Sequence, residues 1–329
     1  MRIVIATPFY PPQLGVLATY AAGLEQAFKK AGHEAIVVPF SRGLPPGLQH
    51  LVYFLRVFLA LRGAGFVLAL DTWSVGMPAF FAARLRGTPF AVRIGGDFLW
   101  ESYIGRTKEP IRLSDFYTKE RDFTLKERLI FQGTRTILHG ARALFFNTRF
   151  QIGLWQPIYG FDGTKAHVLE NFYPTHEVSE PSHGRVFVSA GRHIALKNYA
   201  ELERAFARVK EKHPDIDLDE RLLPPPEHLA RIRKSHAIII PSLSEVSSNT
   251  AIDAVAAGKP FIMTDDTGTK ERLAACGLFV DTRSEAALAQ AIESVLESET
   301  YERLAAATRA FSFTHSWDDI AREVLKAMK

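Results

Sequence analysis

The stretch at 241–261, PSLSEVSSNTAIDAVAAGKPF, constrains the fold more than any other part of the chain. Three consecutive β-branched residues, Ile238–Ile240, precede Pro241 and predict a short buried strand that opens into a loop. Small polar residues at 247–250 predict the start of a helix, which GKP at 258–260 ends before a further strand. Backbone N–H groups at such a helix start can bind an anion. The stretch therefore predicts a strand, loop, helix and strand built around a site for a negatively charged ligand.

Length and charge narrow the class of protein. A chain of 329 residues with 47% hydrophobic residues is long enough for about two domains of about 150 residues each. A formal charge of +4 and a pI near 9.1 suit a phosphate-bearing ligand or an anionic membrane surface. Because the chain has no Lys/Arg stripe and no zinc-finger or RNP-like motif, we expect no nucleic-acid partner.

The cysteine content and the apolar segments indicate a cytoplasmic protein. Cys276 is the only cysteine, which excludes an internal disulfide framework and a cysteine-based metal cluster and fits a reducing cytosol. The N-terminal MRIVIATPFYPP predicts a first strand rather than a signal peptide. No run reaches the roughly 18 apolar residues of a membrane span, so any membrane association would be peripheral, at the inner face.

Both halves of the chain alternate predicted strands and helices, which favours an α/β fold with parallel sheets. The segment 175–184 is polar, contains Pro181 and closes with Gly184, and it is the best candidate for a domain boundary. We therefore predict a Rossmann-like domain at 1–174, a second one at 175–310, and a terminal segment at 311–329 whose helix packs back on the first domain.

Two longer segments of the first half connect its predicted strands. The apolar segment 48–61 fits a helix that covers the sheet, and also fits a helix lying on a membrane surface; packing against the sheet is the simpler interpretation. The charged and aromatic segment 99–137 predicts a loop containing Trp100 and Glu101, followed by a helix near 123–139.

Charged and amide side chains follow the predicted strands of the second half. Arg192 and Lys197 come after the strand at 185–190 and provide the fixed positive charge that a diphosphate needs. Asp253, in the first turn of the predicted helix, could accept hydrogen bonds from two neighbouring hydroxyls of a ribose. Glu245 lies in the preceding loop, where it could face a transferred sugar. An Arg–Lys pair or a carboxylate alone is usually a solvated surface feature, and only their order along the chain makes them informative.

These residues occur in an order that resembles one known family. FVSAGRHIALKN, PSLSEVSSNTAIDAVAAGKPFI and TGTKE follow one another as in the donor-binding domain of family 4 (group 1) retaining glycosyltransferases of the GT-B fold. MRIVIATPFYPPQLG and VLENFYP resemble the N-terminal glycine loop and the interdomain turn of that family. The resemblance implies two Rossmann-like domains facing across a cleft, with donor bound by the second half and acceptor by the first.

The resemblance also implies a role for each matching residue. Glu245 would contact the donor sugar and pyrophosphate as a catalytic residue, Asp253 would hold the ribose, and Asn171 would lie at the hinge. The remaining matches would bind the donor diphosphate: Arg192, Lys197, Gly15, Ser248, Asn249 and Thr250. Family members need no catalytic metal and no cofactor beyond the nucleotide-sugar co-substrate, so none is expected here.

The chain departs from the family pattern at three places. Asp253 stands where the family usually has Glu, which shortens the side chain by one methylene. Gly95-Gly96-Asp97 stands where many members have a His that contacts the sugar, so Asp97 is a candidate for a related catalytic role. The segment 213–235 is shorter than the usual nucleobase side, and the base therefore stays open.

The predicted reaction is transfer of a sugar, with retention, to a hydroxyl acceptor on a glycan, a lipid or a small molecule. Two alternatives stay open at this level. A sugar-nucleotide epimerase or phosphorylase of the same fold would need a different carboxylate set or a much longer chain. A catalytically silent subunit that only binds a sugar nucleotide would fit the substitution at Asp253 and the shortened 213–235 segment.

Overall fold

The computed structural model describes residues 1–13, 15–41, 43, 45, 47–176, 184–189 and 191–329. The chain divides into two compact units. Unit 1 comprises Met1–Leu99, Asp122–Phe172 and His315–Lys329, and unit 2 comprises Trp100–Arg121 and Tyr173–Thr314. The divisions at 172/173 and 314/315 lie close to the expected boundaries at 174/175 and 310/311. Residues 100–121, which the sequence placed with the first domain, lie in unit 2.

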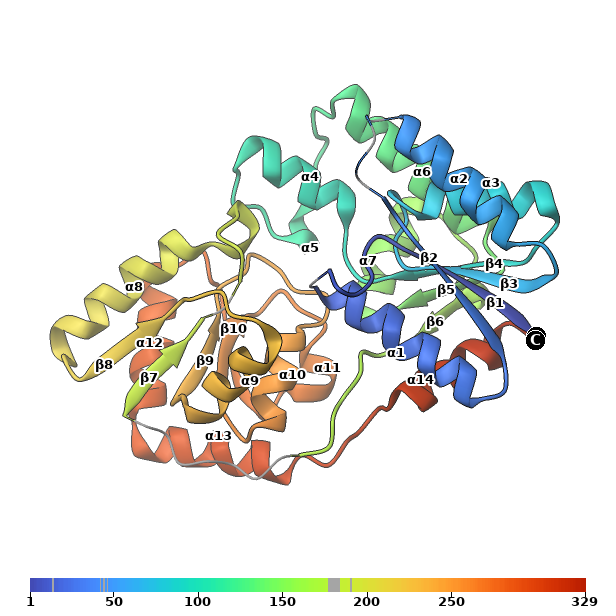
Figure 1. Ribbon diagram of the computed structural model, residues 1–329. Coiled ribbons are helices and arrows are strands. Elements are labelled where there is room, and N and C mark those ends of the chain that lie inside the picture. Colours follow the sequence, from blue (N-terminus) through green and yellow to red (C-terminus); the bar gives the residue numbers. More distant parts are fainter. Residues whose placement is uncertain (14, 42, 44, 46, 177–183, 190) are drawn as a thin grey trace. The chain divides into compact units, whose positions relative to one another are not determined.

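Unit 1 is built on a six-stranded sheet in the order β2-β1-β3-β4-β5-β6, with every described pairing parallel (Figure 1). The strands are β1 Arg2–Thr7, β2 Glu34–Pro39, β3 Ala64–Ala69, β4 Phe90–Ile94, β5 Ala143–Phe146 and β6 Ala166–Val168. The helices are α1 Val16–Lys30, α2 Leu48–Ala60, α3 Gly76–Arg86, α6 Leu125–Gly140, α7 Arg149–Tyr159 and α14 Trp317–Ala327, with a 3-10 turn, η1, at Gly163–Lys165. The central strands are buried on both faces, as parallel strands covered by helices must be.

The terminal helix α14 packs on α1 within unit 1. Trp317 meets Tyr20 edge to face at 5.2 Å and stacks on Phe172 at 4.8 Å between ring centroids. The Trp317 ring lies over Gly23, where an added Cβ would come within 2.4 Å of it. Ile320 and Val324 are fully buried in the same core. The absence of a side chain at Gly23 therefore allows the close approach of the two helices.

Unit 2 contains a five-stranded sheet in the order β11-β10-β9-β7-β8, whose described pairings are also parallel (Figure 1). Its strands are β7 Arg185–Val188, β8 Ile216–Asp219, β9 Ala237–Ile240, β10 Phe261–Thr264 and β11 Gly277–Val280. Its helices are α5 Leu113–Phe116, α8 Tyr199–Lys212, α9 Pro225–Lys234, α10 Asn249–Ala256, α11 Lys270–Leu273, α12 Glu285–Leu296 and α13 Ser298–Ala310, with a 3-10 turn, η2, at Ala195–Lys197. Two apolar clusters, one around Phe187 and Leu288 and one around Ile238 and Phe261, form its core.

Three helices were not predicted, one of them the single turn α5. The segment expected to be a loop contains α4, Phe98–Thr107, which crosses from unit 1 into unit 2. Leu99, Trp100, Tyr103 and Ile104 are buried at helical spacing, so the signal for α4 was present among the aromatic and charged residues. The helix α13 follows α12 after a single residue, Glu297, with no glycine or proline to mark the break.

No helix among the residues that the structure describes combines the length and apolar character needed to cross a membrane.

Candidate functional site

The loops at the carboxyl edge of the unit 2 sheet are joined to one another. Because the strands are parallel, the loops that follow β7, β9, β10 and β11 emerge at the same edge. The Leu243 N–H donates to the Leu196 carbonyl at 2.9 Å, which links the β9 loop to the β7 loop. The Glu245 N–H donates to the Asp266 carbonyl at 3.1 Å, which links it to the β10 loop. These bonds fix the backbone around Glu245 in unit 2.

Lys197 and Glu245 form an ion pair at this edge. The Lys197 Nζ donates to Glu245 Oε1 at 2.5 Å, and Ser242 Oγ donates to the same oxygen at 2.6 Å. Burial alone would lower the pKa of Lys197, but the charge of Glu245 and its hydrogen bond outweigh burial and raise that pKa. The side chain of Lys197 keeps 34% of its surface exposed, against 16% for Glu245. The structure thus holds a permanently charged ammonium that solvent and ligands can still reach.

The loop after β7 presents a second cation. Arg192 is exposed, and its side chain has no hydrogen-bond or ion-pair partner among the described residues. The same loop is fixed further along by Asn198, whose φ of 47° is in the left-handed region and whose Nδ2 donates to the Thr282 carbonyl at 2.6 Å. His193 stacks on Tyr199 at 4.2 Å between centroids. Arg192 is therefore available to bind an anion, and the loop that carries it is anchored at Asn198.

The first turn of α10 is only partly capped. Ser248 Oγ accepts from the Ala251 N–H at 3.3 Å, and the Ser248 N–H donates to Thr269 Oγ1 at 3.1 Å. Among the residues that the structure describes, no acceptor lies within bonding distance of the Asn249 and Thr250 N–H groups. Two orphan donors at the positive end of a helix can bind a negatively charged oxygen. The predicted anion-binding loop thus has the donors that it requires.

Asp253 differs chemically from Glu245. Because α10 begins at Asn249, Asp253 lies in its second turn rather than in the predicted first turn, and burial raises the pKa of its carboxyl from 3.8 to about 6. Within the described chain, no cation or hydrogen-bond donor counteracts this effect. Asp253 keeps part of its surface exposed. It is therefore a desolvated acceptor without a protein partner, which suits a ligand hydroxyl.

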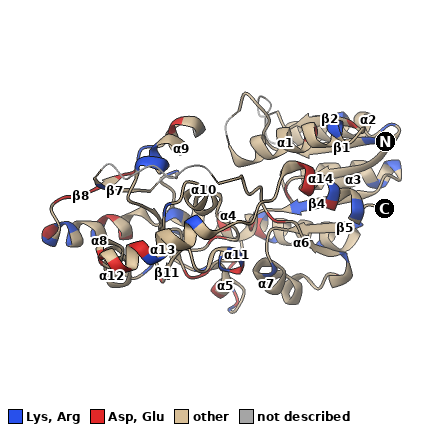
Figure 2. Ribbon diagram, turned by 90° about the horizontal axis from the view of Figure 1, so that it is seen from below, with Lys and Arg blue, Asp and Glu red and all other residues tan. Residues whose placement is uncertain are grey.

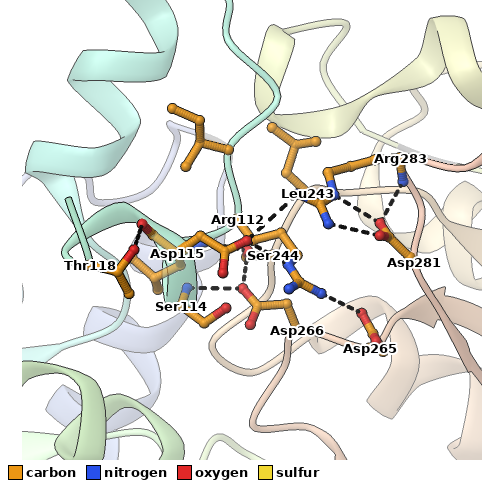
Figure 3. A network of polar contacts seen from close by, with 12 residues as sticks. Arg112, Ser114, Asp115, Thr118, Leu243, Ser244, Asp265, Asp266, Asp281 and Arg283 are labelled. Atoms are coloured by element: carbon orange, nitrogen blue, oxygen red, sulfur yellow. Dashed lines mark hydrogen bonds and ion pairs between the residues drawn. The ribbon is translucent and has the colours of Figure 1, made fainter. Parts of the chain in front are cut away.

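Residues 100–121, here called the docked segment, pack against these loops within unit 2 (Figure 3). The Leu113 N–H donates to Ser244 Oγ at 2.7 Å, and Ser244 Oγ donates in turn to Asp266. The Ser114 N–H donates to Asp266 Oδ2 at 3.2 Å. Ser244 precedes Glu245 in the chain, so the docked segment is bonded directly to the loop that carries Glu245.

Ion pairs extend this contact, as Figure 3 shows. Arg112 lies 3.0 Å from Asp115 and 3.5 Å from Asp265. Arg283 lies 2.8 Å from Asp281 and 3.6 Å from Asp115. The network raises the pKa of Arg283, chiefly through its hydrogen bond to Asp281. Alternating charges from α5 and from the loops after β10 and β11 therefore hold the docked segment in place.

The docked segment also brings a carboxylate toward Lys197. The charge of Glu101, on α4, adds to that of Glu245 in raising the pKa of Lys197. The sequence alone places Glu101 only in a loop and does not predict that this segment contacts the loops of unit 2. Helical spacing could have revealed α4, but no local signal indicates that α4 and α5 pack on a sheet more than a hundred residues further along the chain.

The predicted site residues of unit 1 have mainly structural contacts. Asp97 is 1% exposed and accepts a hydrogen bond from Trp155 Nε1 at 2.8 Å. Asn171 is 3% exposed, and its Oδ1 accepts from the buried Arg93 at 2.6 Å. Its carbonyl also lies 3.0 Å from His315 Nδ1, so Asn171 bonds to the chain where it returns to unit 1. A contact between Asp97 and a sugar remains a prediction.

Gly15 lies at the start of α1 in unit 1. Its φ of 141° is rarely adopted by other residues, and a Cβ there would meet nothing within 4 Å, so conformation rather than space requires glycine. No side chain caps this helix and its first turn has no acidic residue. The α1 start can therefore present backbone N–H groups, and binding of an anion there stays a prediction.

A pocket of about 420 Å³ lies elsewhere in unit 1, at the amino-terminal edge of its sheet. It is lined by residues around the start of β4 and β5 and contains none of the predicted site residues. Three cations reach it, from Arg84, Arg142 and Lys165. Because ligands of open parallel sheets bind at the carboxyl edge, this pocket is not a candidate for the donor site.

Comparison with known proteins supports the sequence resemblance. Residues 223–298 match the family model described as Glycosyl transferases group 1. The solved structure of sucrose-phosphate synthase from Thermosynechococcus elongatus has a TM-score of 0.72 at 13% identity, covering 99% of this chain and 97% of that chain. The Anabaena protein Alr3699/HepE in complex with UDP-glucose has a TM-score of 0.69 at 14% identity, with coverages of 100% and 99%.

A third similar structure has a different assignment. A Listeria monocytogenes protein assigned as a UDP-N-acetylglucosamine 2-epimerase has a TM-score of 0.64 at 15% identity, covering 100% of this chain and 95% of that chain. No curated protein sequence matches this chain. At these identities the structures show the fold alone. The GT-B fold and the resemblance to group 1 glycosyltransferases, both predicted from the sequence, are confirmed.

Proposed function

The chain has the GT-B fold and carries a group 1 glycosyl transferase segment at 223–298, and from this premise we propose that it is a retaining glycosyltransferase. It moves a sugar from a nucleotide-diphosphate sugar to a hydroxyl acceptor on a glycan, a lipid or a small molecule. The observation that carries the proposal is the Lys197–Glu245 ion pair. It lies in the hydrogen-bonded loops at the carboxyl edge of the unit 2 sheet, which also contain the partly capped start of α10.

The donor is bound through its charges and its ribose. Arg192 and Lys197 neutralise the diphosphate, while the N–H groups of Asn249 and Thr250 donate to its oxygens. Asp253 accepts from the ribose hydroxyls, and each such hydrogen bond replaces part of the hydration that its carboxylate has lost. The structures of Alr3699/HepE with UDP and with UDP-glucose support a donor of this class.

Catalysis is electrostatic in this proposal. Negative charge grows on the leaving diphosphate as the bond to the sugar breaks, and fixed positive groups stabilise that charge more than the ground state. Lys197 is held by Glu245, so it needs little reorganisation when the reaction occurs. Glu245 itself contacts the donor sugar. No metal ion is required, because the cations and the helix start supply the charge that a metal would provide.

The unit 1 residues belong to the acceptor side of the proposal. Gly15 allows the start of α1 to approach the diphosphate, and Asp97 faces the transferred sugar once the enzyme has bound its substrates. Asn171 acts at the hinge. The protein works in the cytoplasm, at the inner face of the membrane when the acceptor is a lipid.

Two measurements test the proposal. A thermal-shift panel of nucleotide sugars identifies the donor, and nucleotide diphosphate release is then followed with a panel of hydroxyl acceptors. Lys197→Met and Glu245→Gln should each lower turnover at least a hundredfold. The matched controls Lys210→Met and Asp217→Asn break an exposed ion pair of the same unit and should leave turnover unchanged. Turnover should survive EDTA, and NMR of the product should show a retained anomeric configuration.

A sugar-nucleotide epimerase is the second candidate, favoured by the similar Listeria structure. An epimerase would convert the donor to a second nucleotide sugar without any acceptor, which the same NMR experiment detects. Tight donor binding with neither transfer nor epimerisation would instead identify a catalytically silent sugar-nucleotide-binding subunit and would refute the enzyme assignment.

A further inference from the structure

The outward face of α2 is apolar. Leu48, Leu51, Leu55 and Leu59 are exposed by 49%, 55%, 48% and 70%. Their spacing of three, four and four residues places them in one stripe along the helix. The opposite face is already packed on unit 1, where Val57 is fully buried and the hydroxyl of the buried Tyr53 donates to the Val38 carbonyl at 2.8 Å. A surface helix normally carries polar residues where this stripe lies.

The neighbouring helix α3 extends the apolar surface. α3 packs beside α2 in unit 1 (Figure 1), with the Arg86 guanidinium 3.7 Å from the centre of the Phe58 ring. Phe81 and Leu85 of α3 are exposed by 45% and 72%. We call these six residues the α2–α3 face: Leu48, Leu51, Leu55, Leu59, Phe81 and Leu85. Of thirteen large hydrophobic residues exposed in the described chain, six lie here, a concentration that scattered surface residues do not show.

The charges on α2 and α3 have a single sign, and the carboxylates beside them are Asp71, between the two helices in the chain, and Glu34, which pairs with Arg2. Residues 47–70 and 72–96 contain no Asp or Glu, while α2, α3 and the turn after α2 carry arginines at 56, 62, 84 and 86. In the described chain none of these four arginines has a carboxylate partner. By contrast, the surface helix α8 of unit 2 carries both signs (Figure 2), and its Lys212 pairs with Glu293 of α12. Arg84 also lines the 420 Å³ pocket together with Arg142 and Lys165, so the basic rim continues there.

Leucine-rich stripes flanked by arginines are the pattern of helices that lie in the plane of an anionic membrane. The apolar side chains enter the boundary between headgroups and acyl chains, and the arginines meet the lipid phosphates. α2 has thirteen residues, whereas a span needs about twenty, so it can lie on a bilayer but cannot cross one. The absence of Asp and Glu from α2 and α3 themselves favours contact with lipid phosphates over contact with a protein surface of mixed charge.

We propose that the α2–α3 face is a peripheral membrane-contact surface that seats unit 1 on bilayers rich in anionic lipid. The proposal depends only on unit 1 and not on the glycosyltransferase assignment. Both interpretations of the segment 48–61 then apply to the same helix, because one face of α2 covers the sheet and the other face contacts the membrane.

Co-sedimentation of the full chain with vesicles tests this surface. Vesicles of phosphatidylcholine with 30% phosphatidylglycerol should bind the protein, and vesicles of phosphatidylcholine alone should bind it at least tenfold less. The triple variant Leu51→Gln, Leu55→Gln, Leu59→Gln should lose at least tenfold of the binding. A matched triple variant, Leu125→Gln, Leu129→Gln, Leu222→Gln, removes equally exposed leucines elsewhere and should bind like the wild type.

The arginines give an independent readout. Arg62→Gln with Arg84→Gln should remove the preference for phosphatidylglycerol while the melting temperature stays unchanged. Equal binding by the two leucine triples would overturn the proposal, as would a wild-type chain that ignores both vesicle types. Analytical sedimentation of the free protein measures its oligomeric state. If the wild type is a dimer and only the variant Leu51→Gln, Leu55→Gln, Leu59→Gln is a monomer, the surface binds a second copy of this chain, which would also overturn the proposal.

Discussion

Replacing Asp253 by Asn should stabilise the protein at neutral pH, although we place this residue in the donor site. In the folded chain burial raises the pKa of Asp253 from 3.8 to about 6, and among the described residues no partner compensates. At pH 7 folding therefore forces an ionised carboxylate into a poorly hydrated place. Asparagine has nearly the same shape and no charge, so it removes this cost.

The pKa shift of Asp253 sets the size of the expected change in the free energy of unfolding. A difference between 3.8 and about 6, at about 1.4 kcal/mol per pH unit, limits the cost of ionised Asp253 to about 3 kcal/mol. Because the side chain keeps some exposure to water, we expect a gain of about 1–2 kcal/mol in the free energy of unfolding of Asp253→Asn at pH 8.

The pH dependence has a definite sign. Below pH 3.8 the carboxyl is protonated in both states and Asp253→Asn gains nothing. Between 3.8 and about 6 the unfolded chain releases the proton while the folded chain keeps it, so the wild type loses stability as the pH rises. Above about pH 6 the difference is constant. Urea unfolding of both proteins at pH 4, 6 and 8 measures this profile.

Asp219 provides a control of opposite sign. Hydrogen bonds from Arg221, with the charge of Arg231, lower its pKa from 3.8 to about 2. The stability that it contributes is present above pH 3.8 and is lost as the pH falls toward 2. Asp219→Asn should therefore reduce the free energy of unfolding by about 1–2 kcal/mol at pH 8.

The comparison can refute the reasoning. If Asp253→Asn is less stable than the wild type at pH 8, or gains equally at pH 4 and pH 8, then burial of the charge does not control this site. Under the proposed function, the same variant should bind the nucleotide-sugar donor about tenfold more weakly. A more stable protein with a weaker donor site would show that Asp253 is kept for binding rather than for folding.

Three further predictions concern other parts of unit 2 and a matched position in unit 1. Gly277→Ala should cost about 2–4 kcal/mol in urea unfolding, because its Cβ would lie 2.4 Å from the Phe261 ring, whereas Gly153→Ala in the open on α7 should be neutral or slightly stabilising. Cys276 is 2% exposed, and burial raises the pKa of its thiol to about 11, so iodoacetamide should label it at least about a hundredfold more slowly in the folded protein than in guanidinium; fast labelling would contradict its burial. Ser244→Ala should speed hydrogen exchange of the docked segment by about tenfold and leave exchange in unit 1 unchanged, since it removes a bond of about 1–2 kcal/mol; unchanged exchange would mean that the ion pairs alone hold the segment.

Local patterns in the sequence were enough for most of the βα elements of both units and for the start of α10, but not for α4, α5 and α13. Ile238–Ile240 lie in β9, and Ser248 caps α10 because its Oγ accepts a hydrogen bond from the N–H of the third residue after it, as its type and place predict. Such signals can be seen in a sequence because hydrogen bonds and apolar spacing within a helix or strand involve residues a few positions apart. The order of Arg192, Lys197, Glu245 and Asp253 could be recognised for the same reason.

Tertiary structure alone decided how these side chains meet and how strongly water reaches them. Lys197 and Glu245 are 48 positions apart, and the Leu113–Ser244 bond joins residues 131 positions apart. The raised pKa of Asp253 depends on the atoms packed around it, which no short stretch of sequence specifies. On α2, Leu55 is exposed and Val57 is buried, and this difference likewise depends on which face of the helix packs on the sheet. The stretch 241–261 predicts where an anion site would lie, and long-range packing determined which charged side chains meet there.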